Sequence, residues 1–267
     1  MVLALIVVEA FKGEINSAAW LYTFFSGNIS HALGVGIIPL YHFWSLGVEE
    51  QYYAWYPWMV KYNKKHILYA VCGLCVLWFG VKLGSYIFLG KGIVYRIFSV
   101  TQFDCMMLGA AGATMYYRGT KWFIQLCSNR WVAIIAWVMF FSSGWYARYI
   151  PSPVANEFIA IVSLLVIMAG LVRKPLLENR VMNYLGKISY GIYVIHPILI
   201  YVGTRLLNNV IASGEALRNQ GGVCFAVFIG ISGLTIALAA LSYKYYEMPF
   251  LRMKDKFAVI KSTNENK

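Results

Sequence analysis

Charged residues are scarce in this sequence. They make up 13% of its 267 residues, whereas 60% of the residues are hydrophobic and the mean hydropathy is +0.61. Soluble chains are about 45–50% apolar and about 25% charged, so this composition disfavours both a disordered chain and a soluble enzyme. A backbone in lipid must satisfy its own hydrogen bonds, and we therefore predict an all-α polytopic transmembrane helical bundle.

The motifs of several other protein classes are also missing. The five cysteines are odd in number and scattered, which predicts no disulfide framework. Cys72 and Cys75 have redox or zinc spacing but lie in an apolar run without acidic or histidine ligands nearby, so we interpret them as helix-packing residues and predict no metal site. No phosphate-cradling glycine loop, nucleophile elbow or zinc signature occurs, and the dispersed basic residues indicate no nucleic-acid partner.

Apolar segments organise the chain. They fall at 1–11, 43–60, 67–90, 98–117, 131–147, 154–172, 188–206 and 222–243. The first is shorter than the roughly 20 residues of a span, and it lacks the basic start and cleavage site of a signal peptide. We therefore predict about seven full spans plus a partial first helix. Residues 12–41 are predicted to form an extracytoplasmic loop with a short interfacial helix, and 255–267 a polar cytoplasmic tail.

The net charge of +12 is distributed unevenly between the loops that these segments create. Sixteen of the 23 basic residues fall in one set of alternating loops, and the other seven, including Lys82 and Arg96, fall in the opposite set. Because positive loops stay in the cytoplasm, both ends of this chain are predicted to be cytoplasmic. The sequence thus indicates a multi-pass protein of the cell inner (cytoplasmic) membrane, with the lipid bilayer as its partner.

The stretch 42–57, HFWSLGVEEQYYAWYP, places adjacent carboxylates in an aromatic and apolar run. Each charge at the centre of a membrane helix costs about 2.5–3.5 kcal/mol, so the pair Glu49 and Glu50 suggests a function. On a helix, Ser45, Glu49 and Tyr52 share one face while Glu50 points about 100° away. A carboxylate in a low dielectric holds its proton more tightly, which suits a general base near neutral pH. Alternatively, both carboxylates cap a helix or pair with Arg and Lys at the interface.

Two more polar groups lie inside predicted spans. His196 follows Tyr193 by one helical step and precedes Pro197, which loosens the local backbone hydrogen bonds. A histidine within the membrane is a candidate functional residue, although a lone histidine on an apolar face is also often a packing residue, and both interpretations stay open. Asp104 is expected to pair with Arg96 or with a basic group on another helix, in a structural or substrate-channel role.

The stretch 42–57 resembles the hallmark of the acyltransferase 3 family of integral-membrane O-acyltransferases, WSL-x-VEEQFY-x-x-x-P, with Tyr52 replacing the phenylalanine. Three further stretches resemble the family in the same order: TQFDCMMLGA (101–110), LGKISYGIYVIHPILI (185–200) and YYEMPFLR (245–252). The resemblance implies a family membrane domain over residues 1–254. Members usually begin with two more transmembrane segments that carry an arginine and a histidine thought to be the catalytic base. The chain therefore resembles an N-terminally truncated member, and Gln102 stands where relatives commonly carry arginine.

The resemblance implies a membrane O-acyltransferase, and more narrowly an O-acetyltransferase. It would transfer an acyl group from acetyl-CoA or another acyl-CoA, as co-substrate and without a bound cofactor, to a hydroxyl of a cell-surface carbohydrate or its lipid-linked precursor. Glu49 or Glu50 is the expected acid/base or orienting group, and His196 is the substitute base. The expected acceptor-binding residues are His42, Trp44, Ser45, Tyr52, Asp104 and Tyr193. The cations expected to hold the CoA phosphates are Arg118, Lys121, Arg173 and Lys174.

A rival interpretation comes from another class of protein. An inactive, truncated family member can keep the fold and act as a non-catalytic membrane scaffold or a transporter-like protein. Transfer of labelled acetyl groups by the expressed chain separates the two interpretations.

Overall fold

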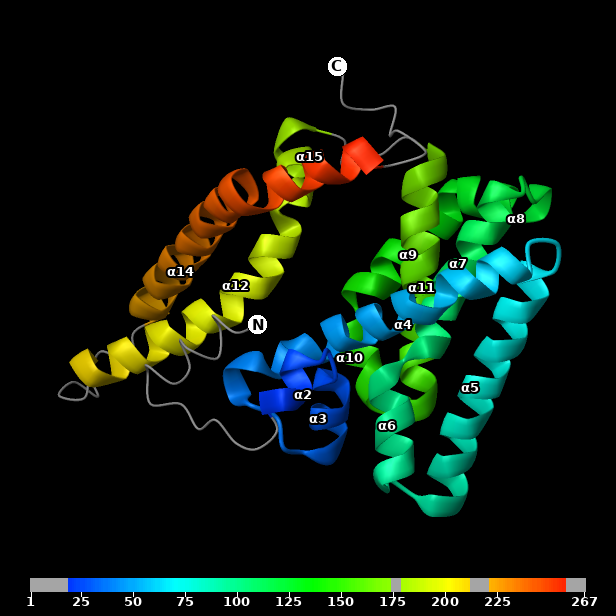
Figure 1. The fold of residues 1–267 in the computed structure, drawn as a ribbon, viewed down its shortest axis with the longest axis horizontal. Coiled ribbons are helices and arrows are strands. Elements are labelled where there is room, and N and C mark those ends of the chain that lie inside the picture. The colour runs from blue at the N-terminus through cyan, green and yellow to red at the C-terminus, as the bar shows by residue number, and fades with distance from the viewer. Residues whose placement is uncertain (1–18, 174–178, 212–220, 258–267) are drawn as a thin grey trace. The chain divides into compact units, whose positions relative to one another are not determined.

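Long apolar stretches fold into helices throughout the part of the chain that the structure describes. The computed structural model describes residues 19–173, 179–211 and 221–257 (Figure 1). These ranges contain helices, turns and loops but no strand, which confirms the predicted all-α class. They divide into two compact units, the first within residues 19–173 and the second within residues 179–257.

The first unit is a succession of helices joined by short turns. Its elements are α2 (Ala19–Thr23), α3 (Gly27–Leu33), η1 (Ile38–Phe43), α4 (Trp44–Tyr62), α5 (Ile67–Leu89), α6 (Ile93–Thr101), α7 (Phe103–Tyr117), α8 (Lys121–Ser128), α9 (Arg130–Phe141), α10 (Ser143–Tyr146), η2 (Ala147–Tyr149) and α11 (Ser152–Arg173).

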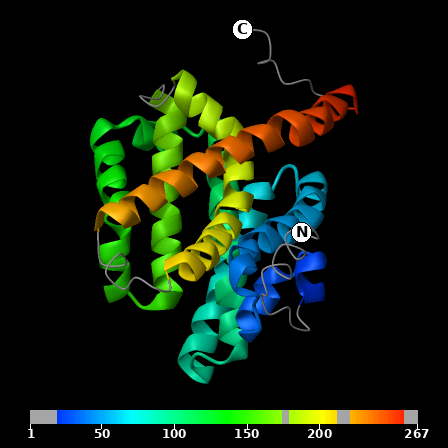
Figure 2. The same cartoon turned by 90° about the vertical axis from the view of Figure 1, so that its left-hand side faces the viewer.

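The second unit is built on two long helices, α12 (Arg180–Ile211) and α14 (Gly221–Ser242) (Figures 1 and 2). A Cβ on Gly191 would lie 3.2 Å from Ala239, and one on Gly203 would lie 3.1 Å from Ile231. The contact positions run in opposite directions along the two helices, so the helices pack antiparallel. A π-helical turn, η3 (Tyr243–Glu247), and α15 (Met248–Phe257) continue from α14.

Four helices of the described ranges are long and apolar enough to cross a membrane, within 67–89, 152–172, 180–205 and 225–253. The pair α8 and α9, bent by 68°, can form a fifth span. The structure thus supplies four or five of the predicted seven spans.

Two predicted segments differ from a plain span, each for a local reason. Segment 43–60 does form a helix, but its three consecutive polar residues 49–51 lower its hydropathy. Segment 98–117 is two helices instead of one, because Gln102 adopts a left-handed backbone with φ 46°. A left-handed residue cannot continue a right-handed helix, and outside glycine it costs about 1–2 kcal/mol.

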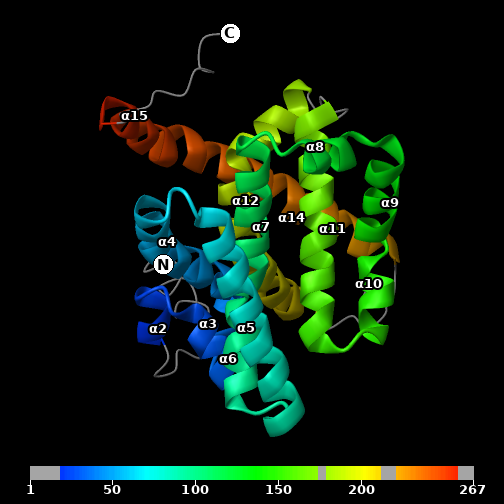
Figure 3. The same ribbon diagram turned by 90° about the vertical axis from the view of Figure 1, so that its right-hand side faces the viewer.

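The core of the first unit lies where α5, α7 and α11 run side by side (Figure 3). A buried cluster joins Tyr52 of α4 to Ile67 and Val71 of α5 and to Met107 and Ala111 of α7. The approach of α7 to α11 depends on a small side chain, because a Cβ on residue 112, a glycine, would overlap the side chain of a leucine on α11. This packing holds the start of α4 and the start of α7 in one place.

Candidate functional site

The start of α4 is held against the segment before α3 by close backbone contact. A Cβ on Gly47 would lie 2.6 Å from the carbonyl oxygen of Phe25, and a Cβ on Gly27 would lie 3.0 Å from that of Phe43. Real Cβ atoms do not approach an oxygen so closely, so only glycine fits at residue 47. The glycine within the WSLGVEEQ stretch therefore fixes the position of the glutamates that follow it.

A hydrogen-bond network holds the next turn of α4. Gln51 Nε2 donates to Asn28 Oδ1 over 2.9 Å and to the carbonyl oxygen of Phe25 over 3.1 Å. Asn28 Nδ2 donates to Gln51 Oε1 over 3.1 Å and to Thr101 Oγ1 over 3.2 Å. Asn28 is buried, so these bonds satisfy an amide that has no access to water. The network joins α4, α3 and the end of α6.

The two glutamates lie differently from their neighbour Gln51. Both Glu49 and Glu50 are exposed on the first unit. The segment therefore combines a fixed amide with two accessible carboxylates.

Tyr52 faces the interior. Its ring stacks on Tyr56 at a centroid distance of 4.7 Å and meets Phe103, the first residue of α7, at 6.0 Å. Its buried hydroxyl has no hydrogen-bond partner among the described residues. Tyr52 thus lies on the core side of α4, with one polar atom unsatisfied there.

The predicted acceptor residues at the start of α4 gather around the turn η1. Ser45 Oγ donates to the carbonyl oxygen of His42 over 3.5 Å, and the His42 ring packs on Phe43 at 4.1 Å. The half-buried Trp44 lies 6.1 Å, between ring centroids, from His31 of α3. The structure therefore brings His42, Trp44 and Ser45 together.

His31 had no assigned role in the sequence and joins this group through the packing of α3 on α4. Its ring also meets Tyr41 edge-on at 4.7 Å, and its Nδ1 has no hydrogen-bond partner within the described ranges. Burial, and secondly the positive charge of Arg96, lower the pKa of His31 from its ordinary value of 6.5. A neutral imidazole beside the glutamate helix is a proton acceptor.

The most deeply buried charges of the first unit form a triad of Lys82, Asp104 and Glu157. Lys82 Nζ donates to Asp104 Oδ2 over 2.5 Å and also to Glu157 Oε1. Lys82 and Asp104 are fully buried, and the Glu157 side chain is 13% exposed. The prediction that Asp104 pairs with a basic group on another helix is confirmed. The assignment of Lys82 to an outer loop is wrong, because this lysine lies inside α5, where two carboxylates compensate its charge.

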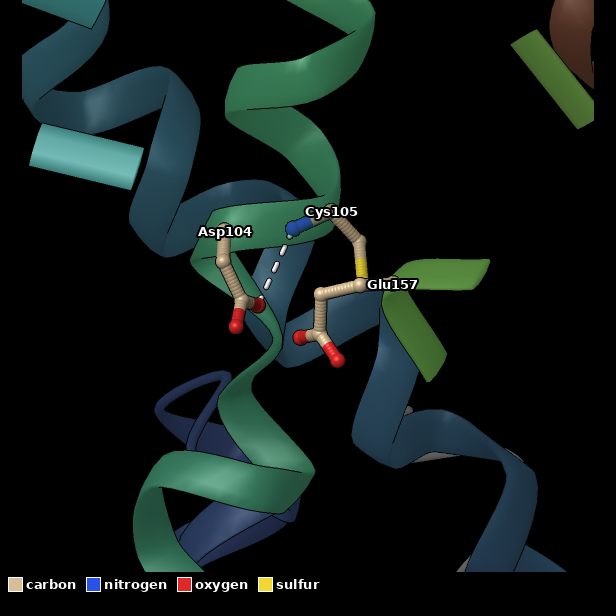
Figure 4. A group of neighbouring side chains, drawn as sticks. All are labelled: Asp104, Cys105 and Glu157. Carbon is tan, nitrogen blue, oxygen red and sulfur yellow. Dashed lines mark hydrogen bonds between the residues drawn. The ribbon is translucent and has the colours of Figure 1, made fainter. Parts of the chain in front are cut away.

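The carboxylates of the triad also resemble a ligand set. One ligand atom each of Asp104, Cys105 and Glu157 lies within 4.8 Å of the others, and the Cys105 amide donates to Asp104 Oδ1 over 3.0 Å (Figure 4). The ammonium of Lys82 contacts both carboxylates and supplies the positive charge that a cation would otherwise contribute. The arrangement fits an ion triad joining α5, α7 and α11.

Residues 101–104 connect these features. Thr101 bonds to the Gln51 network, Phe103 packs on Tyr52, and Asp104 belongs to the triad. The left-handed turn at Gln102 lets neighbouring residues point to three different surroundings. Sequence reasoning missed the partners of this junction, although a lysine and a glutamate inside apolar runs are a readable signal of an intramembrane ion pair.

The second unit carries the remaining predicted residues. His196 lies on α12, which stays helical through Pro197, and its Nδ1 lies 2.9 Å from the Ile192 carbonyl oxygen. Its ring is 6.3 Å from that of Tyr193. A groove of about 730 Å³ between α12 and α14 is lined by His196, the hydroxyl residues 189, 232 and 235, and apolar side chains. His196 belongs to the second unit, and the glutamates belong to the first.

Three of the predicted CoA-binding cations lie at helix ends of the first unit. Arg118 donates from Nη2 to the carbonyl oxygens of Lys64 and Lys65, at 3.2 and 2.9 Å, so its guanidinium joins the end of α7 to the turn before α5. Lys121 is the first residue of α8 and Arg173 the last of α11. The Arg173 side chain and Lys174 lie outside the described part of the chain.

Comparison with known proteins adds a family relationship to this geometry. Residues 1–242 match the sequence profile of the acyltransferase 3 family, described as an acyltransferase domain. Among curated proteins, the Putative O-acetyltransferase SACOL0978 of Staphylococcus aureus strain COL is 24% identical over 235 residues, covering 80% of this chain and 36% of that protein. The O-acetyltransferase OatA of Staphylococcus aureus strain NCTC 8325 is 21% identical over 262 residues, covering 86% of this chain and 39% of OatA. The chain spans little more than a third of the length of these relatives, and no solved structure matches it.

Proposed function

Because the chain belongs to the acyltransferase 3 family, we propose that it is a membrane O-acetyltransferase. It takes an acyl group from acetyl-CoA or another acyl-CoA and delivers it to a hydroxyl of a cell-surface carbohydrate or its lipid-linked precursor. The names of two relatives as O-acetyltransferases support this reaction class. The acceptor class follows from the resemblance of residues 42–57 to the family hallmark.

One observation carries the assignment of the reacting group: the WSLGVEEQ segment has a fixed amide next to exposed carboxylates. Gln51 is bound on both sides of its amide, so its role is to hold α4 in place. Glu49 and Glu50 are exposed and therefore free to meet a substrate. Glu49 is assigned as the base because it shares a helix face with Ser45.

The proposed step is a direct acyl transfer. Glu49 accepts the proton of the acceptor hydroxyl as the oxygen attacks the thioester carbonyl carbon. The tetrahedral intermediate collapses with cleavage of the carbon–sulfur bond, and the CoA thiolate leaves and takes up the proton. Glu50 orients the acceptor, and His42, Trp44 and Ser45 line its approach. His196, with Tyr193 one helical step before it on α12, is the alternative base.

The proposed topology is the one that the charge distribution predicts. Seven spans result if α4 and the broken pair α6 and α7 also lie within the bilayer. With the predicted partial first helix as an eighth crossing, both chain ends lie in the cytoplasm, and the membrane is the cell inner membrane. Cytoplasmic acyl-CoA meets the chain on the side that carries most of its basic residues.

The test is transfer of labelled acetyl groups from acetyl-CoA to membrane glycans by the expressed chain. Glu49→Gln is expected to lower the rate by about 10²-fold or more, because general-base catalysis contributes typically 10²–10⁴-fold. Glu50→Gln is expected to lower it less. Glu265→Gln, which removes a carboxylate from the predicted polar tail, is the matched control and should be unchanged.

Two outcomes contradict the proposal. Full transfer by both glutamate variants would exclude the mechanism, and the absence of transfer from folded wild-type chain would favour the scaffold alternative.

A further inference from the structure

The second unit contains a basic groove apart from the glutamate helix and from His196. It has a volume of about 790 Å³ and lies where the start of α12 meets η3 and α15. Its lining residues with polar or aromatic side chains are Tyr184, Tyr243, Lys244, Tyr245 and Arg252. Apolar residues of α14 and Met248 and Pro249 complete the walls.

The charge of this groove is of one sign. Lys244 and Arg252 line it, and no acidic residue does. Neither cation forms a salt bridge with a carboxylate among the described residues, where the ion pairs are those of Lys82. Lys244 Nζ lies over the Tyr245 ring at 5.2 Å, which keeps the ammonium at the aromatic wall. A cationic groove of this kind attracts a phosphorylated ligand.

The backbone at the groove has an unusual form. Residues 243–247 form a π-helical turn, and the three consecutive residues Tyr243, Lys244 and Tyr245 all line the groove. In an α-helix, consecutive side chains point about 100° apart, so three in a row seldom line one surface. Single π-turns within α-helices occur frequently at functional sites. The widened turn thus exposes one cation and two aromatic rings to the same space.

The groove lies at the end of the second unit that the charge distribution predicts to face the cytoplasm. The antiparallel packing of α12 and α14 brings Tyr184 beside residues 243–252. The basic loops that precede α12 and follow α14 both belong to the sixteen-residue set predicted to be cytoplasmic. Acyl-CoA is dissolved on that side.

We propose that this groove binds the phosphorylated nucleotide portion of acyl-CoA, with its phosphates at Lys244 and Arg252 and its adenine against the tyrosine rings. The inference rests on the proposed O-acetyltransferase function and gives that function a donor site. Cations pair with phosphate oxygens, and aromatic side chains stack on bases. An anionic phospholipid headgroup offers the same phosphate chemistry without the adenine, and the test separates the two ligands.

The first experiment measures CoA binding to the full purified chain in phosphatidylcholine nanodiscs by calorimetry. The double variant Lys244→Gln and Arg252→Gln is expected to weaken the Kd at least about tenfold, the amount that corresponds to one lost charge-assisted hydrogen bond. Lys61→Gln is the matched control, because Lys61 Nζ also lies over an aromatic ring, at 5.4 Å from Trp58, but belongs to the first unit. The control Kd should change less than about twofold.

The second experiment needs no variant. Amine-reactive labelling of the wild-type chain with and without saturating CoA is read by mass spectrometry, and CoA should protect Lys244 but not Lys61. 3′-Dephospho-CoA and pantetheine should bind progressively more weakly than CoA, because each lacks phosphate groups.

The results that would overturn the donor site differ from the result that would overturn the proposed function. Unchanged CoA affinity in the double variant, equal labelling of Lys244 with and without CoA, or no CoA binding by the wild-type chain overturns the groove as the donor site. Phosphatidylglycerol that stays bound during purification is measured in the wild type and in the double variant. If the double variant retains less of this lipid but binds CoA with unchanged affinity, the groove binds a lipid headgroup, and the proposed donor site is likewise overturned. CoA binding at Lys244 without acetyl transfer to glycans would keep the groove and remove the proposed function.

Discussion

Removal of Lys82 should destabilise the first unit more than any other loss of a single charge there. Lys82 contacts both Asp104 and Glu157, and the lysine and the aspartate are fully buried. Lys82→Met keeps much of the side-chain volume but leaves two carboxylates facing each other without a cation. Breaking a buried ion pair by removing one partner costs about 3–5 kcal/mol, because the remaining charge is uncompensated. We expect the free energy of unfolding to fall by this amount.

The measurement is reversible unfolding in mixed micelles, followed by circular dichroism. Lys91→Met is the matched control, since Lys91 is exposed in the turn after α5 and its loss should change stability by less than about 0.5 kcal/mol. Glu157→Gln should cost only about 1–2 kcal/mol, because the Lys82–Asp104 pair stays balanced and the amide oxygen still accepts a hydrogen bond.

The reasoning is refuted by two results. One is a Lys82→Met variant that unfolds within about 1 kcal/mol of the wild type, since that is smaller than the loss of a buried partner allows. The other is a Glu157→Gln variant that is less stable than Lys82→Met, because the charge balance of the triad requires the opposite order.

Three further substitutions probe the surroundings of the glutamate helix. Gly47→Ala places a Cβ 2.6 Å from a backbone oxygen and should cost about 1–3 kcal/mol in thermal unfolding, whereas Gly73→Ala, with open space around it, should cost nothing; equal effects would contradict the close contact. Asn28→Ala leaves buried polar partners unpaired and should cost about 1–3 kcal/mol, and Asn28→Asp should be at least as harmful, because a buried carboxylate cannot donate to Gln51 Oε1 or Thr101 Oγ1; an aspartate variant as stable as the wild type would contradict the network. The pKa of His31 is lower in the folded chain than its ordinary value of 6.5, so the unfolded chain binds the imidazole proton more tightly. The contribution of His31 to the free energy of unfolding is therefore fully present above pH 6.5 and is lost as the pH falls through the lower folded pKa. His31→Gln should therefore flatten the loss of stability below pH 6.5, and an unchanged pH profile would exclude His31 as its source.

The glutamate motif shows how far sequence reasoning reaches into the site. The spacing of residues 44–57 predicts a helix and a shared face, and α4 is a helix over this range. The spacing does not reveal that Gln51 is bound while its two acidic neighbours are exposed. That difference depends on Asn28 and Phe25, more than 20 residues earlier in the chain, and no local pattern encodes such a contact.

The number of membrane spans is a second case. Hydropathy identified the segments that form α5, α11, α12 and α14, because a long apolar helix can be recognised from its composition alone. Hydropathy also predicted residues 98–117 as one apolar segment, whereas the structure has two helices there, α6 and α7. Apolar residues continue on both sides of Gln102, so the left-handed turn at this residue has no signal in hydropathy.

By itself, the sequence determined the helical class, the membrane environment and the family, because these depend on composition, periodicity and a long contiguous motif. Only the tertiary structure decided that Lys82 is a buried partner of Asp104 and Glu157, and that Tyr184 and Arg252 line one groove. These pairings join residues between 22 and 75 positions apart. The physical reason is that a charge inside an apolar run must find its counter-charge, but any helix that packs against it can provide one, and only the packing decides which.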